Sequence, residues 1–293
     1  MKTLLSIDGG GLFGVGVANW VPKLDNWKFD YYAGTSVGAI LAACYASGKK
    51  PSEVQDLFNG DLPKKMFTKP GFPQNLNPLR PYVYGNKEAK KILKGVFGDT
   101  KVKDTEFPLV IVAWNYEKRK EKVFTRKFNG DYLLRDAVLA SMSAPYYFPA
   151  ALIKDENSKE EKLGDGGVCG NDPSLAGIAA MRDDGIIVKN IKCLSVGTTG
   201  TPKEKKLNVS ASIGWLSVIT DVITVGNAEY TSYGISRLLE HNNRYLRVAP
   251  DNLPSGSMDD FNLLAKIKKV WSEWDHLKAL SFLKGNTKAE TKP

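Results

Sequence analysis

The sequence predicts an α/β fold, with a mainly parallel central sheet flanked by helices in three layers. Apolar runs of strand length at residues 3–7 and 29–33 alternate with helix-like segments at 15–24 and 37–47. A glycine-rich turn directly follows the first run. Parallel strands joined through helices need helices on both faces of the sheet, so the regular alternation indicates this architecture.

The same alternation resumes after residues 60–86, where five prolines predict an irregular segment too proline-rich for a helix. Long connections of this kind in small domains are often lids or binding loops. The remaining predicted helices are 87–96, 132–142, 173–182, 211–240 and 259–283, and the remaining predicted strands are 109–114, 122–125, 151–154, 162–163, 191–196 and 245–248.

Composition excludes several classes of protein. The 293 residues are 42% hydrophobic and 25% charged, which excludes a disordered chain, a collagen-like chain and a disulfide scaffold. Cys44, Cys169 and Cys193 have no paired spacing, so we expect reduced cysteines in a cytoplasmic protein with no structural zinc site. Asp8 ends the short N-terminal apolar run and no 18-residue apolar stretch follows, so neither a signal peptide nor a membrane span is expected.

The formal net charge is +9, and most of the surplus lies in residues 51–130, which hold 16 basic and nine acidic residues. Only eight of the 41 basic residues are Arg, whereas base recognition in DNA depends on Arg forks. The lysine-rich surplus therefore favours attraction to phosphates, in lipid or in nucleic acid, without sequence recognition. A surface adapted for solubility explains the same numbers.

Ser36 lies in the motif Gly34-Thr35-Ser36-Val37-Gly38, between a predicted strand and a predicted helix. A nucleophile elbow needs this context, because the tight turn leaves no room for Cβ atoms beside the serine. The helix N-terminus then directs its free N–H groups at the reacting centre. An ordinary glycine-rich turn is the alternative for the motif taken alone.

Gly9, Gly10 and Gly11 follow the first predicted strand, directly after an aspartate. Successive glycines let backbone N–H groups converge on an anion, either the oxyanion of an acyl-transfer intermediate or a phosphate. Residues 9–14 formally match a dinucleotide-binding GxGxxG, with Asp30 at a suitable distance. However, the second strand leads into the serine elbow, and the two sites would compete for one crevice, so the pattern favours the oxyanion hole.

Asp165 is the predicted general base. The chain contains only His241 and His276, and neither has a glycine-shaped setting, so a Ser-His-Asp triad is poorly supported. Asp165 is followed by Gly166 and Gly167, a pattern that is also typical of an ordinary turn or part of a calcium loop. A carboxylate must be buried to become an effective base at neutral pH.

The aromatic, proline-fixed run SMSAPYYFP at 141–149 precedes Asp165 and is predicted to form an apolar wall and an acyl pocket, or else simple core packing. Together these motifs resemble the patatin-like phospholipases. The resemblance covers residues 1–200, and the matching segments are DGGGLFG at 8–14, GTSVG at 34–38, NPLRPYVYGNKEAKKILKGVFGDTKVKD at 77–104, SMSAPYYFP at 141–149 and DGG at 165–167.

The resemblance implies a Ser–Asp dyad in which Ser36 attacks an ester carbonyl and Asp165 activates it. An acyl-Ser36 intermediate is then hydrolysed, without calcium, another metal or a cofactor. Relatives of this type release fatty acids from phospholipids, lysophospholipids or galactolipids. The resemblance assigns the oxyanion hole to Gly9, Gly10 and Gly11, and the support of the elbow and of the base to Gly34, Gly38, Gly166 and Gly167. The family commonly has Arg or Lys where this chain has Phe13.

We therefore expect a lipid acyl hydrolase that is cytoplasmic, binds an anionic membrane surface peripherally and binds no nucleic acid. Phe67 and Phe72, within the basic stretch, are expected to dip into the bilayer. One catalytic domain is expected over 1–285, with a helical part from 201 and a flexible tail at 286–293. The alternatives are a soluble esterase or thioesterase, a toxin or immune-effector phospholipase that needs an activating ligand or protein, and a binding or signalling protein on the same scaffold.

Overall fold

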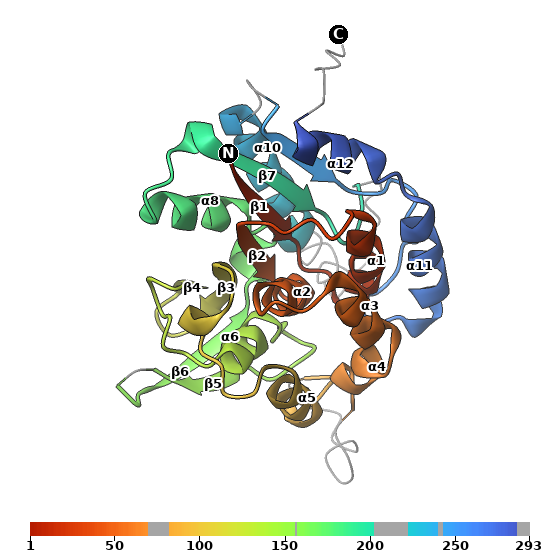
Figure 1. Ribbon diagram of the computed structural model, residues 1–293. Coiled ribbons are helices and arrows are strands. Elements are labelled where there is room, and N and C mark those ends of the chain that lie inside the picture. The colour runs from red at the N-terminus through yellow and green to blue at the C-terminus, as the bar shows by residue number, and fades with distance from the viewer. Residues whose placement is uncertain (70–81, 156, 202–221, 240–242, 286–293) are drawn as a thin grey trace.

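An eight-stranded sheet runs through the middle of the molecule (Figure 1). The computed structural model describes residues 1–69, 82–155, 157–201, 222–239 and 243–285. Within these residues the strand order is β5-β6-β3-β2-β1-β7-β8, and β4 pairs with β3. The strands are β1 (Lys2–Ile7), β2 (Tyr31–Thr35), β3 (Leu109–Asn115), β4 (Lys120–Phe124), β5 (Ala151–Lys154), β6 (Glu160–Asp165), β7 (Ile191–Val196) and β8 (Tyr245–Val248).

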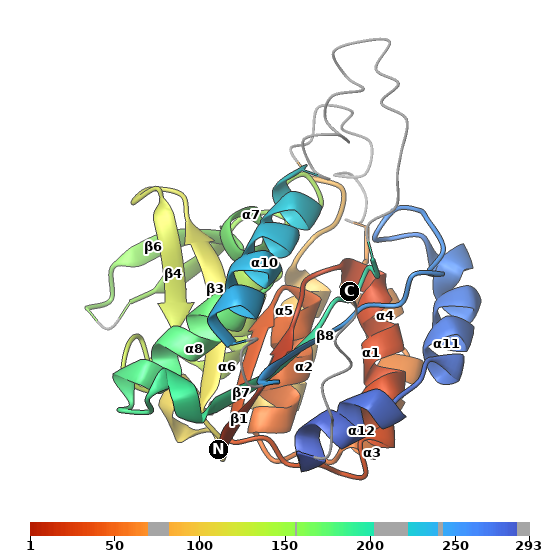
Figure 2. The same cartoon turned by 90° about the horizontal axis from the view of Figure 1, so that it is seen from above.

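Strands β1, β2, β3, β7 and β8 are mutually parallel, whereas β4 and β6 are antiparallel to β3, and β5 and β6 form an antiparallel pair. Helices cover both faces, with α1, α2 and α6 on one side and α8 and α10 on the other (Figures 1 and 2). The predicted three-layer α/β fold is thus confirmed. The helices are α1 (Gly14–Trp20), α2 (Val37–Ala46), α3 (Pro51–Asn59), α4 (Leu62–Met66), α5 (Lys87–Phe97), α6 (Leu134–Ser141), α7 (Gly167–Gly170), α8 (Ser174–Asp183), α10 (Asn227–Leu239), α11 (Leu264–Glu273) and α12 (Leu277–Lys284).

Alternate side chains of β1 enter two separate cores. Leu5 and Ile7 pack with the helices of the α2 face, and Leu4 packs with Ile178 and Met181 of α8. All of these side chains are buried, as expected for a strand covered on both faces. Burial on both faces explains why the strand is a continuous apolar run. The same packing fixes the position of its C-terminal end, which the three glycines follow.

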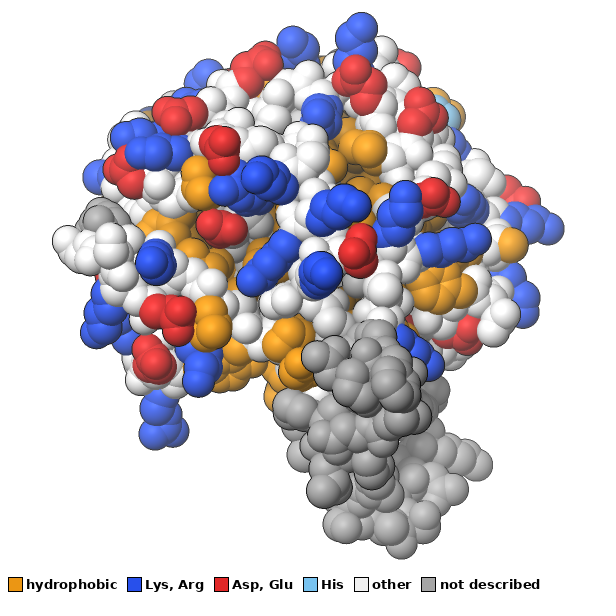
Figure 3. Space-filling view, turned by 90° about the horizontal axis from the view of Figure 1, so that it is seen from below, with side chains coloured by type: hydrophobic (Ala, Val, Ile, Leu, Met, Phe, Trp, Pro, Cys, Tyr) orange, Lys and Arg blue, Asp and Glu red, His pale blue; other side chains and the backbone are white. Residues whose placement is uncertain are grey.

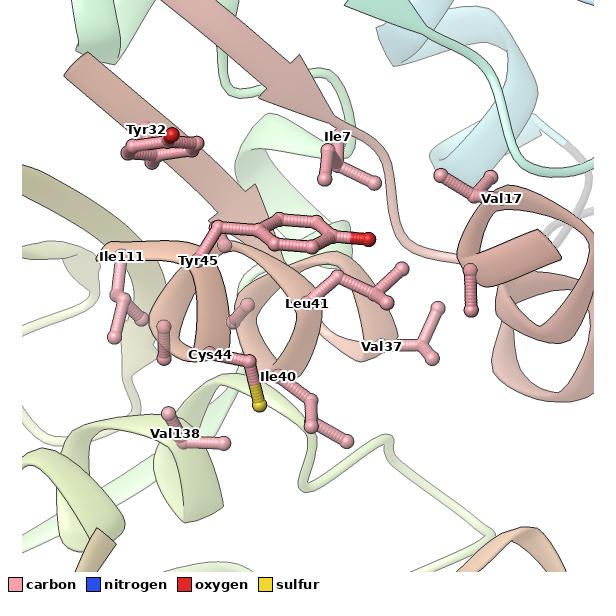
Figure 4. Packing of buried hydrophobic residues seen from close by; sticks show 14 of the residues in the cluster. Ile7, Val17, Tyr32, Val37, Ile40, Leu41, Cys44, Tyr45, Ile111 and Val138 are labelled. Atoms are coloured by element: carbon pink, nitrogen blue, oxygen red, sulfur yellow. The ribbon is translucent and has the colours of Figure 1, made fainter. Parts of the chain in front are cut away.

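Helix α2 is buried along its whole length, from Val37 to Ala46. Figure 4 shows its side chains between Ile7 of β1 and Val138 of α6. A helix that is apolar on all sides belongs inside a protein rather than on its surface. Because α2 begins directly after Ser36, this packing fixes the end of the helix that faces the candidate site.

The structure departs from the expected elements in three places. The segment 60–86 was expected to be irregular, but α4 forms at Leu62–Met66, because Pro63 falls in the first helical turn, where its missing N–H is not needed. Helix α3 was not among the predicted elements. The expected C-terminal helix over 259–283 is divided into α11 and α12, and Trp271 of α11 packs edge-on against Trp20 of α1, with 5.7 Å between the ring centroids.

Some predictions lie outside the described residues: Phe72 and the rest of 70–81 in the proline-rich segment, His241, residues 211–221 and 240 of the helix expected over 211–240, and the tail at 286–293. Among the helices that are described, none is both long and apolar enough to cross a bilayer.

Candidate active site

Ser36 occupies the turn between β2 and α2 with φ 55° and ψ −123°. Positive φ is uncommon for residues other than glycine, and strain of this kind is characteristic of a nucleophile elbow. The flanking glycines explain how the turn closes. A Cβ on Gly34 would collide with the backbone of Gly38, and a Cβ on Gly38 would collide with the Ile7 carbonyl.

A change of partner along β3 brings Asp165 to the elbow. On one edge of β3, Val112 pairs with Thr35 of β2, and the next residue, Ala113, pairs with Asp165 of β6. Strand β4 occupies the other edge over the same residues. Strand β6 therefore takes the place of β2 along this edge of β3. Asp165 pairs one residue further along β3 than Thr35, the residue directly before Ser36.

The Asp165 carboxylate is buried, with 5% of the residue exposed. Burial raises its pKa to about 6, although hydrogen bonding to Ser36 and to the Gly167 N–H lowers it. The Gly167 N–H donates to Asp165 Oδ1 at 2.6 Å. A carboxylate with a pKa near 6 is a far better proton acceptor at neutral pH than an exposed aspartate.

The glycine loop lies against the elbow, and a Cβ on Gly9 would be 3.1 Å from Ser36 Cβ. Gly10 has φ 153° and Gly11 has φ 56°, both unfavourable for other residues. The Gly9 N–H donates to the Asn171 carbonyl at 3.2 Å and is thereby engaged inside the protein. Within the described part of the chain, the N–H groups of Gly10 and Gly11 have no hydrogen-bond partner.

Phe13, where the family commonly has a basic residue, is 4% exposed and packs in the hydrophobic core. This position therefore contributes packing and no charge. Asp30 binds Lys2 and Thr3 at the N-terminal end of β2, the opposite end from the glycine loop. Asp30 is therefore too far from the glycine loop to serve as the acidic residue of a dinucleotide site.

An apolar pocket of about 490 Å³, counting the space at its mouth, opens at Ser36. Met142, Ala144 and Phe148 from the SMSAPYYFP run line it, in agreement with the predicted wall. Phe67 was expected to dip into a bilayer. Instead it is half-buried among Tyr84, Phe148 and Phe261, and its ring forms part of the pocket wall. Other walls come from Val15, Ile40, Phe58, Leu62 and Met66.

The remaining candidate residues lie apart from this pocket. His276 precedes α12 and does not line the pocket. Cys44 and Cys193 are buried and Cys169 is half-buried, all three as free thiols. Across the part of the chain that the structure describes, no three His, Cys, Asp or Glu side chains come together as a metal site would require.

Three residues beside the site were not predicted: Asn171, Asp172 and Arg247. Asn171 accepts from Gly9 through its carbonyl, and Arg247 pairs with Asp8 and Asp172. A usable signal was present for Arg247, because a single charged residue inside the apolar run YLRV suggests a buried partner. Nothing in the sequence indicates which carboxylates it would meet.

Comparisons with known proteins agree with the motifs. The patatin-like phospholipase family model matches residues 5–177. Patatin-like protein 2 of Arabidopsis thaliana is 27% identical over 95% of this chain and 75% of its own length. A cGAMP-activated phospholipase of Vibrio cholerae is 28% identical over 72% of this chain and 67% of its own. The crystal structure of VipD from Legionella pneumophila superposes with a TM-score of 0.47 and 12% identity, covering 92% of this chain and 66% of VipD.

Proposed function

Since the chain belongs to the patatin-like phospholipase family, a family of serine hydrolases, we propose that it hydrolyses fatty-acyl esters of phospholipids or lysophospholipids at a membrane surface. The observation that carries the proposal is the pairing of a strained Ser36 with a buried Asp165 at the opening of an apolar pocket. A nucleophile, a base in contact with it and a place for an acyl chain are the parts that ester hydrolysis needs.

In the proposed reaction the Ser36 Oγ attacks the ester carbonyl while Asp165 accepts the hydroxyl proton. The N–H groups of Gly10 and Gly11 stabilise the oxyanion, and Gly9 holds the loop through Asn171. Collapse of the intermediate expels the alcohol, which takes the proton from Asp165 and leaves acyl-Ser36. Asp165 then deprotonates a water that hydrolyses this ester and regenerates Ser36.

Substrate class follows from the pocket. Its lining is almost wholly apolar, with few groups that could recognise a polar acyl portion. An unbranched hydrocarbon chain fits such a lining, and the ester carbonyl would then lie at Ser36. This supports a fatty-acyl ester over a small polar ester.

The charge distribution supports membrane docking. Lys64, Lys65 and Lys69 are exposed, and they neighbour Pro63, Met66 and Phe67, which line the pocket. Figure 3, seen from below, shows Lys and Arg side chains with Asp and Glu between them on the face that carries α5, whose exposed lysines are Lys87, Lys90, Lys91 and Lys94. Lysines near an anionic bilayer attract it over about a Debye length.

The function is tested by incubating the protein with mixed phospholipid vesicles and identifying released fatty acids by mass spectrometry. Wild-type protein is expected to release fatty acid, whereas Ser36→Ala and Asp165→Asn release none above background. A fluorophosphonate should label wild-type protein and leave Ser36→Ala unlabelled. Fatty acid release by purified, folded Ser36→Ala would contradict the proposal.

The membrane proposal has its own test. The charge reversal Lys64→Glu/Lys65→Glu/Lys69→Glu should weaken hydrolysis of anionic vesicles at least tenfold and leave hydrolysis of a monomeric ester unchanged. The matched control reverses three exposed lysines at the opposite end of the sheet, Lys28, Lys127 and Lys189. Equal loss in both triple variants would assign the lysines to solubility alone.

Two alternatives are distinguished by the same assays. Activity on monomeric esters or thioesters, with none on vesicles, would indicate a soluble esterase or thioesterase. A requirement for an activator is suggested by the cGAMP-activated relative and by a cUMP-AMP-activated phospholipase of Escherichia coli. Vesicle hydrolysis that appears only on addition of cGAMP or cUMP-AMP would select this alternative.

A further inference from the structure

Arg247 forms a two-point ion pair beneath the glycine loop. Its Nη1 donates to Asp8 Oδ1 at 2.9 Å, and its Nη2 donates to Asp8 Oδ2 at 2.6 Å. Strand β7 separates β8, which carries Arg247, from β1, which Asp8 follows. The guanidinium therefore reaches across one strand to hold the residue directly before Gly9.

The same guanidinium contacts a second carboxylate. Arg247 Nη1 lies 3.4 Å from Asp172 Oδ2 and donates to Ser195 Oγ at 2.7 Å. Asp172 is 2% exposed and also accepts hydrogen bonds from Ser6 and from the backbone and side chain of Ser174. The Asp172 carboxylate therefore has several hydrogen-bond donors besides Arg247, whereas the Asp8 carboxylate accepts chiefly from Arg247.

Both carboxylates belong to segments that meet at the candidate site. Asp8 precedes Gly9, and Asp172 follows Asn171, whose carbonyl accepts from the Gly9 N–H. The Asn171 side-chain oxygen also lies 2.5 Å from the position of a Cβ on Gly9 and 3.2 Å from that on Gly167. One cation thus ties together the loop beside Ser36 and the segment that follows Asp165.

Among the residues that the structure describes, Arg247 does not line the apolar pocket, and both of its Nη atoms donate to groups of the protein. Its contribution to the reaction must therefore act through the two loops. We propose that Arg247 is a positioning residue that holds the Gly10 and Gly11 N–H groups and Asn171 in place for catalysis, an inference that rests on the proposed Ser36 hydrolase. An arginine suits this role, because its planar fork fixes a carboxylate in orientation as well as in distance.

The test compares Arg247→Met, Arg247→Lys and the control Arg244→Met. Arg244 is buried three residues earlier and donates to the Val188 carbonyl, away from the cluster. With a soluble acyl ester, Arg247→Met should lower kcat about 100-fold and change KM less than about threefold, the pattern of a displaced oxyanion donor. Arg247→Lys keeps the charge and loses the fork, so kcat should stay about tenfold below wild type. Arg244→Met should keep the wild-type kcat.

A second measurement does not depend on activity. Amide hydrogen exchange at residues 9–13 should become about tenfold faster in Arg247→Met and Arg247→Lys, with the strand β3 unchanged. If Arg247→Met does not fold, Arg247→Lys decides the question. Wild-type kcat and wild-type loop exchange in Arg247→Lys would overturn the proposal. If Ser36→Ala stays fully active, the hydrolase mechanism fails, while loop exchange still tests Arg247.

Discussion

The Ser141 hydroxyl accepts a hydrogen bond from the Ser36 N–H at 2.9 Å and donates one to the Val112 carbonyl at 2.6 Å. Its own carbonyl accepts from the Gly166 N–H at 3.3 Å, next to Asp165. The last residue of α6 is therefore connected to both members of the proposed dyad. It also satisfies a buried donor in the strained turn, which would otherwise lose a partner.

Replacing Ser141 by Ala removes the side-chain bonds and keeps the backbone. We expect kcat to fall about tenfold to 100-fold, because the elbow loses its fixed orientation, with a loss of about 1–3 kcal/mol in the free energy of unfolding. Ester hydrolysis and urea denaturation measure the two effects. The control is Ser143→Ala, because the Ser143 hydroxyl donates to the Leu139 carbonyl of α6 and not to the elbow. Similar loss of kcat in both variants would refute a specific role for Ser141.

The fold was predictable because its signals are local. The apolar runs of β1 and β7 and the glycines at Gly34 and Gly38 each follow from a few neighbouring residues. The boundaries of the elements were predicted less well: the second strand begins at Tyr31 rather than at residue 29, because tertiary pairing with β1 and β3 sets its ends.

The site was predictable only in part. The motifs identified Ser36 and Asp165, but not the change of partner along β3 that brings them together, because strand register depends on distant pairings. The sequence motif also assigned Gly9, Gly10 and Gly11 the same role in the oxyanion hole. The hydrogen bond from the Gly9 N–H to the Asn171 carbonyl distinguishes Gly9 from the other two. Arg247 lies more than 200 residues from Asp8, beyond the reach of any local pattern.

Activity should depend on the ionisation of Asp165. Because burial raises the pKa of this base to about 6, kcat/KM for a soluble ester should rise with pH and reach half its maximum near pH 6. The proton must be absent for Asp165 to accept one from Ser36, so the limb falls on the acid side. A half-maximum near 3.8, the ordinary value for aspartate, would contradict the role of burial.

As a control for this pH profile, circular dichroism at each pH measures whether the protein remains folded. A loss of structure that coincides with the loss of activity would assign the acid limb to unfolding and not to Asp165. The rate at which a fluorophosphonate labels Ser36 across the same pH range measures the reactivity of the nucleophile without substrate turnover.

Asp165→Asn should inactivate the enzyme and stabilise the protein at neutral pH. The pKa of Asp165 is raised from 3.8 to about 6, so between these values the folded protein keeps a proton that the unfolded chain has lost. The free energy of unfolding therefore falls as pH rises through this interval, by up to about 3 kcal/mol. Asparagine carries no charge and avoids this loss. Its advantage should be absent near pH 4 and complete above pH 6.

Denaturation of both proteins at the two pH values measures this difference. The matched control is Asp131→Asn, at an exposed carboxylate whose pKa is lowered by Lys103 and Lys101, so that variant should gain no stability at neutral pH. A neutral-pH gain of equal size in the control would show that the effect comes from net charge and not from burial.

Ala144 offers a way to test where the acyl chain lies. It is half-buried, lines the pocket and comes three residues after the end of α6, so a larger side chain there is expected to project into the cavity. Ala144→Phe should lower kcat/KM for long-chain esters at least tenfold, because filling the pocket excludes methylene groups that each contribute about 0.8 kcal/mol when buried. Short-chain esters should be hydrolysed at close to the wild-type rate, and Ala144→Gly, which only removes a methyl group, should keep the wild-type preference. A series of p-nitrophenyl esters of increasing chain length measures the change, and equal loss at every length would place the acyl chain elsewhere.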